Sequence, residues 1–284
     1  MEVDGAGIGP SSQQAAAAPS RQRGRLPLQM RTLVSELSLL NRSDGSAKWR
    51  QDGSSVVAAV HGPRLANPRR EDAEKAIVEV VYKPRTGIQG HRERELEHII
   101  RRTLEGIIIL GMHPRTSIMV VLQETNCDGS MLSCALNAAC AALVDAGIPM
   151  SSMLSSVTCA VNQEGALLLD PDSLEEQSAR LIVSMAFAHH SAAQGMGHEA
   201  TRDGAAGSKH GDAHLDGPDK LQGGIKVDQG ALMCHTWPGS SPDSSIGSPG
   251  IQAETMLDCF DCCALGCGKV AEFLRSAFTK ALAA

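Results

Sequence analysis

The chain has very few aromatic residues: two Trp, one Tyr and four Phe among 284 residues. Base stacking needs aromatic faces, so a nucleic-acid site in this chain would have to rely mainly on charge. No apolar run approaches the roughly 20 residues that a membrane-spanning helix needs. The N-terminus is rich in Gly, Ala, Ser and Gln and has neither the cationic flank nor the apolar core of a signal peptide. We therefore expect a soluble protein with no membrane partner.

The net charge of −6 is unevenly distributed along the chain. Residues 21–115 hold 18 of the 26 Lys and Arg residues and only 11 of the 32 acidic residues. A basic half of this kind is an electrostatic surface suited to a phosphate backbone. The alternative interpretation is a set of solvated helix faces without a partner.

Nine cysteines are present, and in a chain without a signal peptide this number favours free thiols over disulfides. Cys259, Cys262, Cys263 and Cys267 include the CxxC spacing that zinc sites also use. However, Cys259, Cys263 and Cys267 recur every four residues, as they would along one face of a helix. Cysteines in that arrangement pack as small apolar residues. We predict core packing and no bound metal, with a zinc site as the alternative.

Hydrophobic periodicity predicts an α+β fold in which mixed β-sheets pack against α-helices. Helices are expected at about 90–110 and 130–146, because apolar residues recur there with the helical period before Gly and Pro end each pattern. An amphipathic helix is expected at about 252–280. The predicted strands are residues 55–61, 76–82, 117–123, 155–162, 166–170 and 180–187.

Composition divides the chain into four parts. Residues 1–24 are of low complexity and are expected to be disordered. Residues 25–190 form the predicted core, and residues 252–284 form a C-terminal helix that docks on it. Residues 191–251 are rich in Gly, Ser and His and are expected to form an irregular insert, in which 231–237 has the character of a strand. Histidines in and next to this insert lack regular ligand spacing and are expected to be solvated, namely His189, His190, His198, His210 and His214.

The most informative segment, residues 122–149, predicts the end of a strand, a turn at Asp128, Gly129 and Ser130, and a helix of small residues. Backbone amides of a glycine turn at a helix N-terminus form an anion site. No Lys or Arg belongs to this turn, and Met131 follows it directly. The sequence therefore predicts a phosphate-site architecture without its cation. The alternative is a plain helix N-cap turn.

Four segments in order resemble the RNase PH family, and most closely the RNase PH-like subunits of the eukaryotic RNA exosome. They are residues 42–64, 76–123, 122–149 and 166–187, and the resemblance resumes at about 252–280. It implies an RNase PH-like fold. Active members trim RNA from its 3′ end with inorganic phosphate, which requires a cation-lined phosphate pocket and an acidic residue or a metal near the leaving oxygen.

Two features of active members are missing at the matching positions. Met131 stands where they have an Arg in the phosphate turn. Near the start of the predicted strand 180–187, where they have an Asp, this chain has Ala179, Arg180, Leu181 and Ile182. The resemblance therefore implies that phosphorolysis is lost.

Basic residues cluster where the family's RNA-facing loop lies, namely Lys83, Arg85, His91, Arg92 and Arg94. Cationic side chains neutralise phosphates and bind single-stranded RNA without reading its sequence. We predict RNA contact at this cluster. The alternative is a solvated helix start, because glutamates alternate with the arginines.

Acidic residues cluster after the predicted strand 166–170, namely Asp170, Asp172, Glu175 and Glu176. Several carboxylates in so short a segment can hold a divalent ion such as Mg²⁺ for hydrolytic cleavage. The more common arrangement is a turn followed by an N-capped helix start. Catalysis by this cluster belongs only to the second of two functional hypotheses.

The first hypothesis is a non-catalytic RNase PH-like ring subunit of the RNA exosome, without a cofactor, that contributes to RNA binding and assembly. The resemblance implies a hexameric ring of such subunits, RNA-binding cap subunits as further partners, and 3′-5′ RNA processing and degradation in rRNA maturation and mRNA turnover. It also implies location in the nucleus, nucleolus and cytoplasm. The second hypothesis is a nuclease in its own right: a homodimeric 3′-5′ exoribonuclease, or a DNA-cutting enzyme, acting by metal-dependent hydrolysis or residual phosphorolysis.

Overall fold

The protein is known from a computed structural model, which describes residues 21, 24–189, 231–238 and 253–283. The expectation of disorder for residues 1–24 falls almost wholly outside these residues, as does most of the 191–251 insert. The same holds for the histidines His190, His198, His210 and His214. Arg21 is described and buried, so part of the segment expected to be disordered has a fixed place in the fold.

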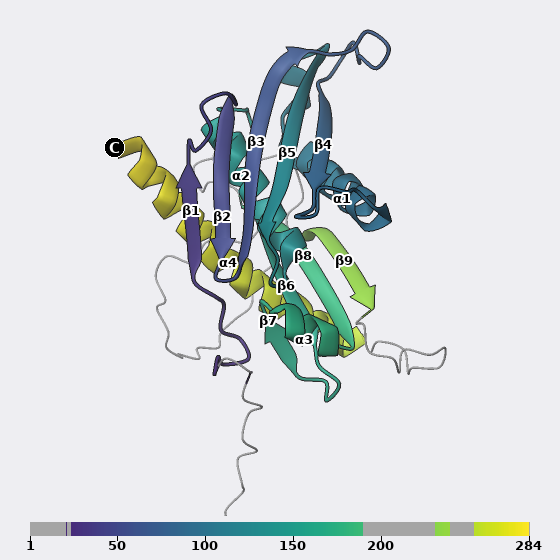
Figure 1. Cartoon of the computed structure of the whole chain (residues 1–284), viewed down its shortest axis with the longest axis vertical. Helices are drawn as coiled ribbons and strands as arrows, with labels where there is room; N and C mark the ends of the chain where they lie inside the picture. The colour runs from purple at the N-terminus through teal and green to yellow at the C-terminus, as the bar shows by residue number, and fades with distance from the viewer. Residues whose placement is uncertain (1–20, 22–23, 190–230, 239–252, 284) are drawn as a thin grey trace, which may run out of the picture.

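The first sheet is mixed and has the strand order β1-β2-β3-β5-β4. Its strands are β1 (Leu33–Leu37), β2 (Gly45–Gln51), β3 (Ser54–Leu65), β4 (Ile77–Lys83) and β5 (Thr116–Asn126). Neighbours are antiparallel except β4 and β5, which are parallel and are joined through helix α1 (His91–Ile107) and the short 3-10 turn η1 (Leu110–Met112). Because β4 and β5 are parallel, their carboxyl ends lie at the same edge of the sheet (Figure 1).

The second sheet is antiparallel and has the order β7-β6-β8-β9. Its strands are β6 (Met153–Val161), β7 (Leu167–Leu169), β8 (Leu181–His189) and β9 (Ala231–Pro238), with the short helix α3 (Ser173–Ser178) between β7 and β8. Strand β9 confirms the strand character of residues 231–237 and removes them from the irregular insert. His189 is buried and lies 2.5 Å from Ser155 Oγ through its Nε2, so the expectation that it is solvated is wrong.

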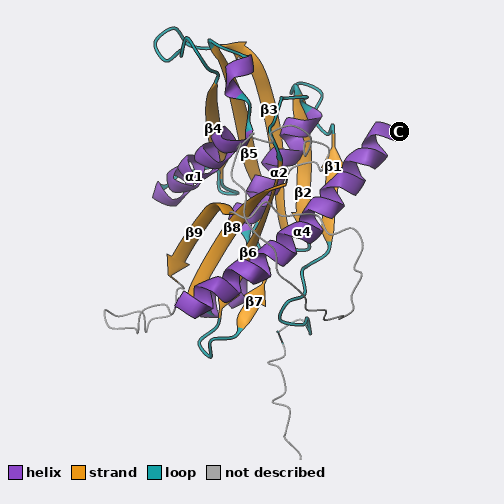
Figure 2. Cartoon of the chain, turned by 180° about the vertical axis from the view of Figure 1, so that it is seen from behind, coloured by secondary structure: helices purple, strands orange, loops and turns teal. Residues whose placement is uncertain are grey.

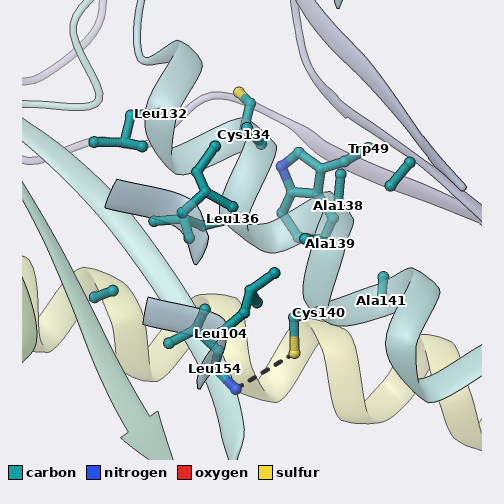
Figure 3. Close-up of a cluster of buried hydrophobic side chains, with 14 of the residues drawn as sticks. Trp49, Leu104, Leu132, Cys134, Leu136, Ala138, Ala139, Cys140, Ala141 and Leu154 are labelled. Carbon is teal, nitrogen blue, oxygen red and sulfur yellow. Dashed lines mark hydrogen bonds between the residues drawn. The ribbon is translucent and has the colours of Figure 1, made fainter. Parts of the chain in front are cut away.

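Helix α2 (Met131–Asp145) contacts both sheets, with all twelve residues from Leu132 to Leu143 buried. Most of these residues are Ala, Cys or Ser, and small side chains allow a helix to approach β-strands closely on several sides. Figure 3 shows this core, in which Leu154 N donates a 3.4 Å hydrogen bond to Cys140 Sγ. The sequence prediction of a helix at 130–146 is confirmed.

Helix α4 (Ala253–Ala283) crosses the back of the second sheet and reaches towards β1 (Figure 2). Its buried face carries Cys259, Cys263 and Cys267, each without solvent exposure. Cys267 Sγ donates to Ser155 O at 3.6 Å, and Ser155 Oγ donates to Cys267 O at 3.0 Å. These cysteines therefore pack as core residues, as their helical spacing predicts. Within the described ranges, no three His, Cys, Asp or Glu side chains are grouped so that they could hold a metal ion.

None of the helices among the described residues combines the length and the apolar character required to cross a membrane. The α+β fold expected from the sequence is confirmed.

Candidate functional site

The carboxyl ends of β4 and β5 lead to the N-termini of α1 and α2, and a pocket of about 430 Å³ lies beside these two helix starts. Ligands of open sheets commonly bind at such an edge, where helix amides and loops converge. The pocket is completed by α3 and by the two strands β8 and β9. Its lining residues are Arg92, Leu96, Cys127, Ser130, Met131, Leu132, Thr158, Ser173, Glu176, Gln177, Ile182, Ser184 and Trp237.

The turn Asp128-Gly129-Ser130 is held tightly against the start of α3. Gly129 has φ +80°, and a Cβ there would lie 2.6 Å from Pro171 O and 2.9 Å from Ser173 N, so only glycine fits. Ser130 is also left-handed, with φ 55°, and its hydroxyl donates to Pro171 O at 3.0 Å rather than capping α2. The turn is thus more specialised than the plain N-cap turn that was the alternative reading of the sequence.

A carboxylate from this same chain occupies the anion position at the start of α2. Ser130 N donates a hydrogen bond of 2.6 Å to Glu176 Oε1. Burial raises the pKa of Glu176, against the opposing effects of this amide and of the Arg92 charge. The helix terminus that could bind a free anion therefore binds Glu176.

The other three acids of the cluster are committed to structural contacts. Arg31 binds Asp170 through two hydrogen bonds, Nη2 to Oδ1 at 2.6 Å and Nε to Oδ2 at 2.9 Å, and both side chains are 1% exposed. The same guanidinium donates to Asp128 O at 2.6 Å, which ties the phosphate turn to the acidic cluster. Asp172 caps α3 by accepting from Leu174 N and Glu175 N. The N-capped helix start is therefore the correct reading for Asp172.

Glu175 is bound by arginines from the N-terminal segment. Arg21 donates from Nε to Oε1 at 2.8 Å and from Nη2 to Oε2 at 2.6 Å, and Arg25 Nη2 approaches Oε2 at 3.4 Å. Burial by itself would raise the pKa of Asp170 and of Glu175, but Arg31 and Arg21 respectively outweigh it and hold both values below the ordinary range. These acids are stabilising ion-pair partners.

The predicted RNA-binding residues are all exposed, but Arg92 and Arg94 line different hollows of the surface. Lys83 ends β4, Arg85 lies in the following loop, and His91 begins α1. Arg92 lies over the Trp237 ring, 5.4 Å from its centroid, and lines the pocket. Arg94 instead lines a separate open groove along β4 together with Arg70, Glu79, Glu97, His98 and Arg101. The structure therefore separates Arg92 from Arg94, because residues two apart on a helix face different directions.

Apolar residues stand where the resemblance places an acid. Leu181 begins β8 and is buried, and Ile182 lines the pocket opposite Trp237 in the strand register. Ser184 is the next pocket residue along this strand. Trp237 itself was missed by reasoning from the sequence. The signal that could have found it is an aromatic residue in a candidate strand that resumes after a long Gly-rich segment.

Comparison with known proteins agrees with this geometry. Residues 29–149 match domain 1 of the 3′ exoribonuclease family, the RNase PH family. The chain is 44% identical to the "Exosome complex exonuclease RRP46 homolog" of Arabidopsis thaliana over 59% of this chain and 70% of that protein. It is 43% identical to the RRP46 homolog of Oryza sativa subsp. japonica over 59% of this chain and 71% of that protein.

Among solved structures, rice (Oryza sativa) Rrp46 superposes with a TM-score of 0.69 and 30% identity, covering 90% of this chain and 99% of the other. The Archaeoglobus fulgidus exosome with RNA bound to its active site superposes with a TM-score of 0.64 at 15% identity, covering 89% of this chain and 92% of the matched one. The archaeal likeness shows the shared fold.

Proposed function

Because this chain belongs to the RNase PH family of 3′ exoribonucleases, we propose that it is an RNase PH-like ring subunit of the RNA exosome which binds RNA without cleaving it. The 44% identity to an RRP46 homolog over 70% of that protein's length carries the assignment to the exosome. The proposal includes the absence of catalytic activity in this subunit. Its support is chemical: Met131 and Ile182 line the pocket where charged groups are needed, and Glu176 occupies the anion position.

The proposed partners are the other RNase PH-like subunits of a hexameric ring, the RNA-binding cap subunits, and single-stranded RNA. The proposed role is 3′-5′ RNA processing and degradation in the nucleus, nucleolus and cytoplasm. A ring subunit needs two different interfaces, each of roughly 1,000 Å² or more in total buried area. Purification of the tagged chain from cells, followed by identification of the proteins that accompany it, tests this assignment. Recovery of the chain only as a monomer or homodimer would contradict it.

Hydrolysis is not proposed, since three of the four acidic residues are already bound. Asp170 and Glu175 are paired with arginines, and Asp172 caps a helix. A cation drawn to these oxygens would have to displace Arg31 or Arg21.

Purified protein is expected to release no nucleoside diphosphate from RNA in the presence of inorganic phosphate. After the glycine turn the pocket has Met131 in place of the guanidinium of active members, and Glu176 repels an incoming phosphate. Thin-layer separation of labelled products distinguishes diphosphates from the monophosphates of hydrolysis. Met131→Arg alone is expected to stay inactive, because Ile182 still provides no acid. Diphosphate release above that of a mock preparation would overturn this part of the proposal.

Arg92→Glu is expected to weaken RNA binding by the protein or its assembly. It is also expected to make the negative slope of log affinity against log salt concentration shallower by about one unit. Arg92 lies at the pocket, whereas Arg94 lies in the groove along β4. Arg94→Glu makes the same charge reversal in the same helix turn and is the matched control, with a smaller expected effect on RNA affinity and on the salt dependence. Filter binding across a salt series measures both quantities, and equal effects of the two reversals would show that only the overall charge of the helix start matters.

A further inference from the structure

The pocket beside α2 contains two features that a phosphate site does not need. One is a carboxylate, Glu176, where a phosphate would bind. The other is an indole, Trp237, which also lines the pocket. Each feature comes from a different element, α3 and β9, and each points to a ligand that is not an inorganic anion.

Within the part of the chain that the structure describes, one carboxylate oxygen of Glu176 can still accept a hydrogen bond from a ligand. Its Oε1 accepts from Ser130 N, and no described residue donates a hydrogen bond to its Oε2. Burial disfavours the charged form of this carboxyl, so a ligand that donates an N–H group to it would stabilise the buried carboxylate. An amino group on a flat, neutral ligand fits this requirement, whereas phosphate does not.

Trp237 forms a flat wall of the pocket together with Arg92. The Arg92 guanidinium carbon lies 5.4 Å from the centroid of the indole ring. His235, whose ring centroid is 4.5 Å from that of Trp237, approaches Glu95 at 3.5 Å and so links β9 to α1. Aromatic faces and guanidinium planes are the groups on which unpaired bases stack. The volume of about 430 Å³ is within the range of small-molecule pockets.

We propose that this pocket binds a nucleobase instead of inorganic phosphate, with the base stacked on the Arg92–Trp237 wall and its amino group donating to Glu176. The proposal deepens the proposed RNA-binding function and rests on it. Carboxylates accept from the N4 amino group of cytosine, whereas the O4 atom at the equivalent position of a uracil-type base is an acceptor. Cytosine is therefore preferred over uracil.

Titration of the purified full chain with uncharged nucleosides tests this proposal through tryptophan fluorescence. The chain has only two tryptophans, and Trp49 has no solvent exposure, so a change in emission reports on Trp237. Cytidine is expected to quench emission and to bind about tenfold or more tighter than uridine, the order of effect that one hydrogen bond to a charged group supplies. Inorganic phosphate is expected to have no effect.

Glu176→Gln changes the hydrogen bond to the base but leaves the stacking contact, because the shape of the side chain is retained. An amide both accepts and donates, so the preference for cytidine over uridine is expected to disappear. Glu164→Gln removes the same charge from an exposed turn between β6 and β7 and is expected to retain the preference. Trp237→Ala is expected to weaken the binding of cytidine and of uridine alike by about fivefold or more, measured by ligand-observed NMR. Trp237→Phe is expected to restore part of the lost affinity.

Three results would overturn the proposal: equal affinity of the wild type for cytidine and uridine, phosphate binding at least as tight as cytidine binding, or no nucleoside binding at all. If the chain gives any of these results but still co-purifies with ring subunits and binds RNA, only the nucleobase pocket is rejected and the proposed function stands. Failure of co-purification would instead reject the proposed function.

Discussion

Arg31→Ala is expected to lower the free energy of unfolding by about 3–5 kcal/mol, the usual cost of breaking a buried ion pair by removing one partner. Arg31 and Asp170 are each 1% exposed, and Arg31 also donates to Asp128 O. Its loss would leave the Asp170 carboxylate buried without its guanidinium partner at the point where β5, α2 and α3 meet. Urea unfolding at pH 7, followed by circular dichroism, measures the change.

Arg64→Ala is the control for this prediction. Arg64 pairs with Asp44 at 3.1 Å, but their side chains are 59% and 47% exposed, so the expected cost is below about 1 kcal/mol. The double variant Arg31→Leu with Asp170→Asn is expected to recover part of the loss, because no charge is then left buried alone and Asn tolerates the left-handed backbone of residue 170, φ 54°. A cost for Arg31→Ala as small as that for Arg64→Ala would show that Asp170 is readily rehydrated.

Acid unfolding examines the same pair. The pKa of Asp170 is lower in the folded protein than the unfolded value of about 3.9. Its stabilising effect is therefore complete above the unfolded pKa and is lost as pH falls through the folded pKa. The double variant Arg31→Leu with Asp170→Asn is expected to lose less stability than the wild type below about pH 4.

Gly129→Ala is expected to destabilise the protein by more than the 1–3 kcal/mol that a left-handed backbone alone costs a residue with a side chain. Gly129 has φ +80°, and its new Cβ would meet three backbone atoms of residues 171–173 within 3 Å. Backbone cannot rotate away as a flexible side chain can, so the turn and the start of α3 must separate. Thermal unfolding measures the loss of stability.

Gly165→Ala is a closely matched control for Gly129→Ala. Gly165 has φ +82°, but a Cβ there would meet nothing within 4 Å. The two variants share the conformational strain, and the difference between them isolates the overlap with residues 171–173. Equal melting temperatures for the two variants would mean that residues 171–173 move away from the new Cβ at little cost, and that the glycine turn is not rigidly held by α3.

Local sequence patterns predicted the helices well. The helix expected at 90–110 is α1 (His91–Ile107), and the helix expected at about 252–280 is α4 (Ala253–Ala283). Each of these patterns depends on residues three or four apart, which a helix itself brings together. Strand β2 (Gly45–Gln51) was not found by alternation, since its sequence GSAKWRQ is mostly polar although most of it is buried. Gln51 is buried beside Cys134, whose Sγ donates to Gln51 Oε1 at 2.6 Å, a contact that no local pattern contains.

The sequence by itself determined the α+β fold, the glycine turn before a helix of small residues, and the missing cation at Met131, because each depends on neighbours in the chain. Only the tertiary structure decided what the acidic cluster does. Arg21 and Arg31 reach Glu175 and Asp170 across 154 and 139 positions, and Glu176 reaches Ser130 across 46. Trp237 enters the pocket from a strand that follows the long insert. Such contacts depend on which strands pair and which helix ends meet. The four clustered carboxylates resemble a metal site in the sequence, but three of them make structural contacts and the fourth, Glu176, occupies the anion position at the start of α2.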